Sequence, residues 1–272
     1  MDDDIRRFLQ EDLNGSGDIT SQSLFTNEQA QAHIIAKQDC ILAGLHIVEE
    51  IFTHTNCTCN AQHHDGEFVK KGTHILTVSG PIISMLSSER LALNFLGHMS
   101  GIATKTRELV DLCKPLNPTL QIAATRKTIP GIRTYQKRAV EIGGGIRHRE
   151  GLYDAIMVKD NHLKFFDSVE EAIEKIREKS AELPIEIEVE KESDAIAAAQ
   201  LHVSTIMLDN QSPDQTQKIS QKIREIYPEI LIESSGNITK ENIQSYAPYV
   251  DRISLGCLTH SVQNCDFSME IL

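Results

Sequence analysis

The sequence predicts a β/α barrel from residue 120 onward, preceded by a smaller mixed α/β region. Apolar runs of strand length recur through this part of the chain, and helix-like stretches with charged faces separate several of them. Strands and helices that alternate in this way form parallel sheets with right-handed crossovers. A row of such units predicts a barrel, complete or open. The strand-like runs are QIAA, DAIMV, IEIEV, STIMLD, EILIES and RISLG.

Composition and charge narrow the class of protein. The chain has 272 residues, of which 40% are hydrophobic and 24% charged, as in a globular protein with a true core. A net charge of −12 argues against general binding to nucleic acid or to anionic membranes, because both require a basic face. No apolar run has the length of a signal peptide or a membrane span, and the six cysteines are scattered. We expect a cytoplasmic protein with reduced thiols.

The N-terminal region has a different pattern. A short helix and the Gly-rich turn NGSGDITS are expected within residues 1 to 30. The runs AQAHIIAKQDCILAG and THILTVSG, with polar turns around them, predict hairpins. The next segment is apolar on most sides and has no internal proline, which predicts a largely buried helix or helix pair. Its sequence is PIISMLSSERLALNFLGHMSGIATKTRELVDLC.

A basic stretch interrupts this acidic chain. Seven lysines and arginines but a single acid, Glu141, lie in the stretch from Arg126 to Arg149. Such a reversal indicates either an anionic partner or the ordinary charged surface of a helix. Lys137 and Arg138 follow PGIR, and we assign them to the solvent face of the expected helix.

Charged residues and glycines follow the predicted strands at the same point of each unit. In β/α barrels the functional residues gather at the carboxyl ends of the strands. We therefore expect these residues to converge on one pocket. They are Thr125, Arg126, Lys127, Lys159, Asp160, Glu188, Asp209, Ser235, Gly236, Asn237 and Gly256.

The strand IEIEVE carries three acids on one face, Glu186, Glu188 and Glu190, because side chains alternate along a strand. Parallel strands covered on both faces are normally apolar throughout. These acids must therefore meet cations, a metal ion or water. A solvent-facing edge strand is the alternative, because edges tolerate charge. The candidate cations are Lys127, Arg149 and Lys159.

The last two units place glycines before expected helix starts, in SSGNITKEN and SLGCLTHS, with Thr239 as a candidate N-cap. Free N–H groups at a helix start bind phosphate, and such sites recur on the final units of β/α barrels. Each glycine could also serve only a turn. Cations, acids and a phosphate cradle together outline a phosphoribosyl transfer site, where acids hold Mg²⁺ or sugar hydroxyls.

Long motifs in matching order resemble the quinolinate phosphoribosyltransferase family over nearly the whole chain. The resemblance implies an open seven-stranded β/α barrel with an N-terminal α/β sandwich domain. The expected domains are residues 1–103 with the C-terminal tail 261–272, and residues 104–260. The motifs are EDLNGSGDITS, SSERLALNFLGHMSGIAT, TRKTIPGIR, AVEIGGGIRHREGLYDAIMVKDNH, IEIEVE, IMLDN, ESSGNI and SLGCLTHS.

The resemblance also implies a reaction. Quinolinate and phosphoribosyl pyrophosphate would give nicotinate mononucleotide, pyrophosphate and CO₂ in NAD biosynthesis, with Mg²⁺ and without a covalent intermediate. The implied assembly is a homodimer, or a hexamer built from dimers, in which Arg90 reaches the neighbouring subunit's site. Without the family, an intrachain acid is an equal alternative partner for Arg90, because an unpaired charge in an apolar helix is costly.

Residue roles follow from the same resemblance. Lys127, Glu188 and Asp209 are the predicted catalytic residues, and the two acids would lie near the ribose hydroxyls and Mg²⁺. Thr125 belongs to the same substrate motif. The usual family residue before His148 is Asn, where this chain has Arg147. The residues implied to grip carboxylates and pyrophosphate are Arg126, Lys127, His148, Arg149 and Lys159. Those implied to hold the 5′-phosphate are Ser235, Gly236, Asn237, Leu255, Gly256 and Cys257.

Two further motifs have simpler interpretations. Cys57, Cys59, His63 and His64 fit no standard zinc spacing, so we expect a turn-rich segment. The glycines at 143–145 lack the context of a dinucleotide site, so we expect a turn that presents the next residues.

Two other functions stay open at this stage. One is a lyase that forms a Schiff base on Lys127 or Lys159. The other is a non-enzymatic or altered relative, since homologues linked to molybdate transport share this fold.

Overall fold

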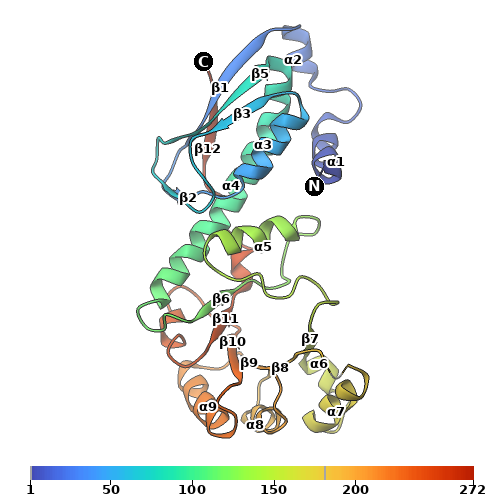
Figure 1. The fold of residues 1–272 in the computed structure, drawn as a ribbon, viewed down its shortest axis with the longest axis vertical. Coiled ribbons are helices and arrows are strands. Elements are labelled where there is room, and N and C mark those ends of the chain that lie inside the picture. Colours follow the sequence, from blue (N-terminus) through green and yellow to red (C-terminus); the bar gives the residue numbers. More distant parts are fainter. Residues whose placement is uncertain (1, 181) are drawn as a thin grey trace. The chain divides into compact units, whose positions relative to one another are not determined.

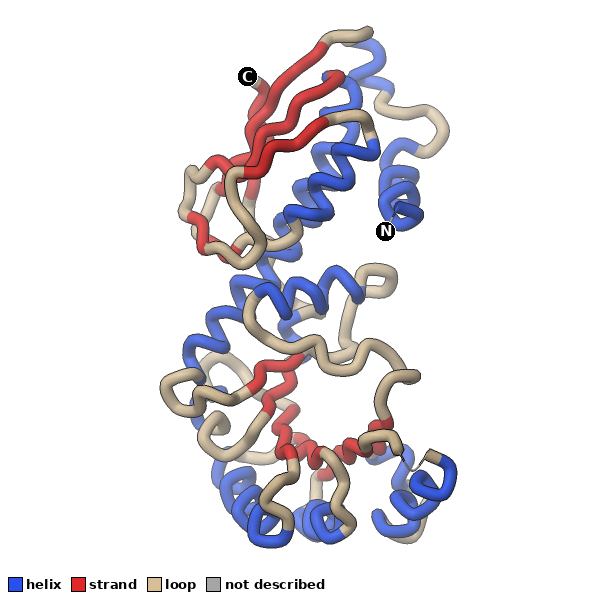
Figure 2. The backbone as a smooth tube through the Cα atoms, viewed as in Figure 1, coloured by secondary structure: helices blue, strands red, loops and turns tan. Residues whose placement is uncertain are grey.

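The structure is a computed structural model that describes residues 2–180 and 182–272. The chain divides into two compact units, whose elements are labelled in Figure 1 and coloured by type in Figure 2. The first unit contains Met1–Lys105, Glu141–Gly143 and Ser261–Leu272, and the second contains Thr106–Val140 and Gly144–His260. Within the described residues, no helix is long and apolar enough to cross a membrane.

The first unit is built on an antiparallel sheet with the strand order β12-β1-β5-β3. Its C-terminal strand pairs with β1, so that Ala32 lies opposite Ile271 and Ala36 opposite Phe267. A separate two-stranded ladder joins β2 (Cys40–Ile41) to β4 (Phe68–Val69). The strands of the main sheet are β1 (Gln29–Ala36), β3 (Thr58–Ala61), β5 (His74–Pro81) and β12 (Phe267–Ile271).

One face of this sheet is covered. Strand β1 buries Ala32, Ile34 and Ala36, at every second position, which is the period of a strand with one packed face. Helices α3 and α4 run along the sheet in Figure 1. The long apolar segment after Pro81 forms one continuous helix rather than a pair. The helices are α1 (Asp2–Leu13), α2 (Ile19–Leu24), α3 (Leu45–His54) and α4 (Ile82–Cys113).

The second unit contains the predicted parallel sheet, with the strand order β6-β11-β10-β9-β8-β7. Its first and last strands along the chain, β6 and β11, are neighbours, and the sheet curves round as an open barrel with helices α7, α8 and α9 outside the curve (Figures 1 and 2). The strands are β6 (Gln121–Ala123), β7 (Ile156–Val158), β8 (Ile185–Val189), β9 (Thr205–Asp209), β10 (Leu231–Ser235) and β11 (Arg252–Ser254). The helices are α5 (Arg133–Ile142), α6 (Asp160–Leu163), α7 (Val169–Lys179), α8 (Glu192–Gln200) and α9 (Pro213–Ile226), with short 3₁₀ turns η1 (Ile243–Ser245) and η2 (Gly256–Leu258).

The fold class, an open β/α barrel with a smaller α/β unit, is confirmed, and all six strand-like runs form strands of one sheet. The seventh strand implied by the family is reduced to one parallel bridge, between Ile146 and Ala123 on the free edge of β6. Ile146 accepts from the Ala124 N–H and donates to Ile122. Gly144, with φ +95, turns the chain into this bridge, and a single-residue bridge has no alternating pattern to find in a sequence.

The two faces of the barrel sheet carry different side chains. On β8, Ile185 and Ile187 are buried and share one face, and Glu186 and Glu188 lie on the other face, where Glu188 lines the barrel cavity. Strand β8 lies between β7 and β9, so the alternative of a solvent-facing edge strand is wrong. The acids therefore point into the barrel, where they need partners.

Close packing at Gly145 should make the bridge intolerant of a side chain. A Cβ there would lie 2.7 Å from the Ile122 carbonyl oxygen and 2.8 Å from Val140 Cγ1. We expect Gly145→Ala to lower the free energy of unfolding by about 1–3 kcal/mol, measured in urea, because such overpacking forces the backbone to shift. Gly15→Ala, with open space around the added carbon, is the control and should change stability much less. Equal stability of the two variants would contradict this packing.

Candidate active site

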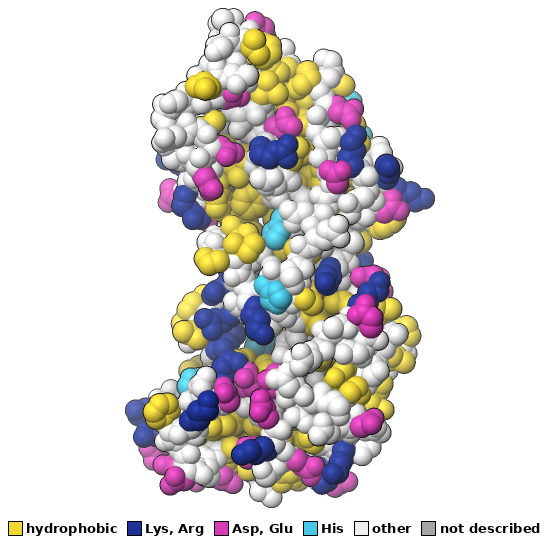
Figure 3. Space-filling view, turned by 180° about the vertical axis from the view of Figure 1, so that it is seen from behind, with side chains coloured by type: hydrophobic (Ala, Val, Ile, Leu, Met, Phe, Trp, Pro, Cys, Tyr) yellow, Lys and Arg dark blue, Asp and Glu magenta, His cyan; other side chains and the backbone are white. Residues whose placement is uncertain are grey.

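A cavity of about 340 Å³ opens at the carboxyl ends of the barrel strands. Basic and acidic side chains also gather side by side over the barrel unit, in the lower part of the space-filling view in Figure 3. Nine of the residues predicted to bind substrate line the cavity. They are Thr125, Arg126, Lys127, His148, Arg149, Lys159, Glu188, Asp209 and Ser235.

Three cations form the basic side of the cavity. Arg126 and Lys127 come from the loop after β6, and Arg149 comes from the segment after the Ile146 bridge. In the part of the chain that the structure describes, none of the three forms an ion pair with an acid, and the buried Arg126 Nε has no hydrogen-bond partner. Burial lowers the pKa of Arg149, and the nearby Arg126 guanidinium lowers it further. An anion in the cavity would relieve this repulsion.

Glu188 and Asp209 form the acidic side, at the ends of β8 and β9. Lys159 donates to Glu188 Oε2. Burial raises the pKa of Asp209, and the charges of Glu188 and Glu190 raise it further. Two crowded carboxylates that both have oxygen donors suit a hard divalent cation, which would favour their ionised forms. The residues present therefore fit Mg²⁺.

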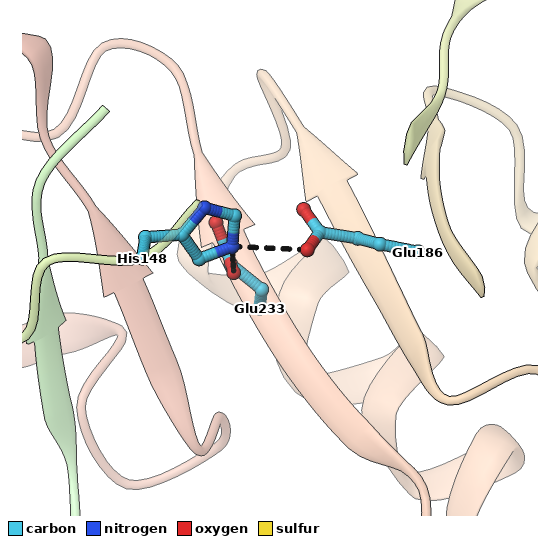
Figure 4. Close-up of side chains that lie close together, drawn as sticks. All are labelled: His148, Glu186 and Glu233. Atoms are coloured by element: carbon cyan, nitrogen blue, oxygen red, sulfur yellow. Dashed lines mark hydrogen bonds and ion pairs between the residues drawn. The ribbon is translucent and has the colours of Figure 1, made fainter. Parts of the chain in front are cut away.

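A buried network of four charged or titratable groups adjoins the cavity, and three of them are drawn in Figure 4. His148 Nε2 lies 3.0 Å from Glu186 Oε2 and 3.7 Å from Glu233 Oε2. Arg252 Nη1 lies 3.1 Å from the same oxygen of Glu233 and 3.9 Å from that of Glu186. Glu233 is fully buried, and its pKa is raised by burial and by Glu186.

The donor atoms of His148, Glu186 and Glu233 are close enough together to hold a metal ion, all lying within 4.8 Å of one another. The Arg252 guanidinium, however, already lies within ion-pair distance of both carboxylates. We interpret the network as a buried ion-pair cluster that orients His148. Strand register creates it, because Glu233 is paired with Arg252 across β10 and β11.

Gly236 and Gly256 lie in the two loops that were expected to bind phosphate. A Cβ at Gly236, which has φ +84, would lie 2.3 Å from Asn210 Oδ1, and one at Gly256 would lie 2.8 Å from Lys127 Cδ. Asn237 donates through Nδ2 to the same Asn210 oxygen, at 2.9 Å. At Gly236 the positive φ as well as the contact disfavours a side chain, whereas at Gly256 the flexible Lys127 side chain could move aside.

Of the residues implied to hold the 5′-phosphate, Ser235 lines the cavity, but Gly236, Asn237, Leu255, Gly256 and Cys257 do not. Leu255 is buried and donates to the Ala123 carbonyl, and Cys257 lies in η2. The expected N-cap at Thr239 is wrong. Asn242 Oδ1 accepts the Thr239 N–H, and only the short 3₁₀ turn η1 follows, so no α-helix begins there.

Arg90 and Asp160 do not line the cavity. Arg90 is exposed on α4 in the first unit, so water solvates its charge and it requires no intrachain acid. Asp160 is exposed on α6, with Lys164 Nζ 3.6 Å away.

In the segment considered for zinc, Cys57 is buried and His63 lies 2.8 Å from Glu67.

The assignment of Lys137 to the solvent face is wrong. Its side chain is fully buried, and it donates to the backbone carbonyls of Arg147 and Arg149. The segment from 146 to 150 covers this face of α5, which no periodicity within the helix itself could reveal. Arg138, its neighbour, is exposed as expected.

Several residues around the cavity escaped the sequence analysis. Glu233 and Arg252 are charged residues that belong to barrel strands. Like Glu186, they place a charge within a predicted strand, and this was the signal in the sequence that could have identified them. Met157, Met207 and Ser254 also line the cavity but carry no chemical signature in the sequence.

The geometry defines a class: an open β/α-barrel protein with a mixed-charge cavity built for a small, highly anionic ligand. Comparison with protein families gives the particular family. The model of the quinolinate phosphoribosyl transferase C-terminal domain matches residues 102–270, and that of the N-terminal domain matches residues 18–100. The chain belongs to the quinolinate phosphoribosyl transferase family.

Similar proteins agree with this assignment. The probable nicotinate-nucleotide pyrophosphorylase [carboxylating] of Bacillus subtilis is 40% identical over 272 residues, covering 98% of this chain and 92% of that protein. The nicotinate-nucleotide pyrophosphorylase [carboxylating] of Mycobacterium leprae is 37% identical, with 99% and 96% covered. The crystal structure of NadC from Streptococcus pyogenes has a TM-score of 0.94 at 37% identity, covering 100% of this chain and 96% of that one.

The buried network predicts a large cost for losing its guanidinium. We expect Arg252→Met to lower the free energy of unfolding by about 3–5 kcal/mol, because the buried Glu233 carboxylate loses its closest cation. Lys240→Met removes an exposed ion pair with Glu108 in the same unit and should cost less than about 1 kcal/mol. Urea unfolding measures both. Similar values for the two variants would show that the network does not stabilise the barrel.

Proposed function

We propose that this chain transfers the phosphoribosyl group from phosphoribosyl pyrophosphate to quinolinate, with release of pyrophosphate and CO₂, and so forms nicotinate mononucleotide for NAD biosynthesis. The observation that carries the proposal is the cavity in which Arg126, Lys127 and Arg149 converge with no carboxylate partner among the described residues. Both substrates are small and multiply anionic, as such a cavity requires. Membership of the family supports the same reaction.

The charges suit the bond that must break. Departure of pyrophosphate from the anomeric carbon builds positive charge on the ribose and negative charge on the leaving group. Fixed cations stabilise the leaving group, and Glu188 and Asp209 can stabilise the developing positive charge on the sugar. These opposite charges line one cavity, so a single substrate can contact both.

Most of the remaining work is positioning. The pyridine nitrogen of quinolinate is itself the nucleophile, so the chain has to hold it against the anomeric carbon rather than activate a nucleophile of its own. The loss of CO₂ then follows on the nucleotide. Cations that hold the second carboxylate would orient the group that leaves.

The proposal includes Mg²⁺ as cofactor, held by Glu188 and Asp209 or by the substrate's pyrophosphate beside them. The ion would supply positive charge to the phosphates when bound. Lys159 donates to Glu188, and both side chains line the cavity.

A homodimer completes the proposal. Arg90 is exposed on the first unit, where it is available to a neighbouring subunit's site, as the family resemblance implies. A hexamer would be built from such dimers. The six cysteines are free thiols, which suits the proposed cytoplasmic location.

A turnover assay tests the function directly. The purified protein with quinolinate, phosphoribosyl pyrophosphate and Mg²⁺ should produce nicotinate mononucleotide and CO₂, detected by chromatography and by release of labelled carboxylate. Chelation by EDTA should abolish turnover, and added Mg²⁺ should restore it. Nicotinate, tested in parallel, should be a poor substrate. Preference for nicotinate would instead indicate a salvage-type transferase, and failure with both would overturn the proposal.

Lys127 tests the role of the basic side. Lys127→Ala should lower kcat by about 10²–10³-fold, the loss typical of removing one group that stabilises charge in the transition state. Lys218, an exposed lysine on α9, provides the matched control, and Lys218→Ala should leave kcat unchanged. Wild-type turnover by the Lys127 variant would show that this ammonium does not act in the reaction.

A further inference from the structure

Helix α5 holds a buried lysine that the proposed reaction does not use. Lys137 is completely buried, and its Nζ donates to the carbonyl oxygens of Arg147 and Arg149, the latter at 2.7 Å. These two carbonyls belong to the residues on either side of His148. The ammonium therefore binds the main chain directly around a residue that lines the cavity.

The same segment has further anchors. Arg133, one turn earlier on α5, donates from Nη1 to the Glu150 carbonyl at 2.9 Å. The Glu150 carboxylate accepts from Arg147 Nε at 2.6 Å, and Asp154 accepts the Glu150 and Gly151 N–H groups. Two cations of α5 thus take up the three carbonyls at 147, 149 and 150. Much of the basic stretch serves the protein's own loop rather than the ligand.

The backbone conformation of His148 explains why the carbonyls of this segment need hydrogen bonds from α5. His148 has φ +53, in the left-handed region that an L-residue seldom occupies without support from its surroundings. A left-handed residue between two others allows the flanking carbonyls to converge on one donor. With Lys137 on those carbonyls, the imidazole points to Glu186 and the Arg149 side chain lies along Met157 into the cavity.

Burying an ammonium for this purpose is unfavourable in itself. The pKa of Lys137 is lowered to about 8, chiefly by burial. The charges of Arg133 and Arg147 also lower this pKa, and those of Glu150 and Asp154 raise it. The group is still protonated at neutral pH, where a charged donor binds two carbonyls more strongly than a neutral one. A purely apolar side chain would fill the same space without that desolvation cost.

We propose that Lys137 is a positioning residue for the transfer reaction: it holds the 146–150 segment in the conformation that places His148 and Arg149 in the cavity. This inference rests on the proposed function for its kinetic consequence but not for its structural one. Lys137 itself does not line the cavity.

The kinetic test replaces the ammonium with an apolar chain of similar length. Lys137→Met should bind quinolinate about 10²-fold more weakly by calorimetry and lose a similar factor in kcat/KM, because a small misplacement of binding groups costs about that much. Lys218→Met, the same substitution on the exposed face of α9, should match the wild type. A folded Lys137→Met protein with wild-type affinity and kcat/KM would overturn the inference.

A double-mutant cycle separates positioning from general destabilisation. If Lys137 acts through His148 and Arg149, Lys137→Met should cause less than about a threefold further loss in a His148→Ala/Arg149→Ala background. A merely structural role would give the full loss again, multiplied onto that of the background, and would contradict the inference.

Hydrogen exchange provides a readout that needs no substrate. In Lys137→Met, the amides of residues 146–151 should exchange at least about tenfold faster than in the wild type, while the amides of β8 and β9 should not change. Unchanged exchange in 146–151 would overturn the positioning role whatever the substrate. Accelerated exchange in an enzyme that does not use quinolinate would instead contradict only the proposed function.

Discussion

The repulsion among Arg126, Lys127 and Arg149 constrains the rest of the barrel unit. In the part of the chain that is described, these cations have no acid of their own, although the chain carries a net charge of −12. Their charge is available because nearby acids are engaged elsewhere, Glu188 with Lys159 and Glu186 with His148 and Arg252. A highly anionic substrate would complement the positive charge of these three cations.

Charges in this unit therefore fall into two groups with different tasks. Those deep in the barrel, such as Glu233 and Arg252, compensate one another and shape the floor of the cavity. Charged residues on α5, such as Lys137, bind main-chain carbonyls and hold the 146–150 segment in its conformation. Only the charged residues that have neither of these two roles face the ligand. The basic stretch that follows β6 thus combines structural and binding roles within one short segment.

Sequence reasoning succeeded where a pattern repeats. Apolar runs of strand length predicted every strand of the six-stranded barrel sheet. The positions of Lys127, Glu188 and Asp209 at the strand ends predicted that they share a cavity. It failed where the partner lies far along the chain. Lys137 looks like a surface helix residue until the 146–150 segment covers it, and the bridge at Ile146 is too short to leave a pattern.

The sequence by itself determined the fold class, the family and the set of cations, because apolar periodicity and long ordered motifs are local properties of the chain. Tertiary structure alone decided which charges neutralise one another. Pairing between separate strands, such as Glu233 with Arg252, depends on register across the sheet. The left-handed turn at His148 likewise depends on contacts from another element. Electrostatic partners are set by distance in space, which local sequence does not encode.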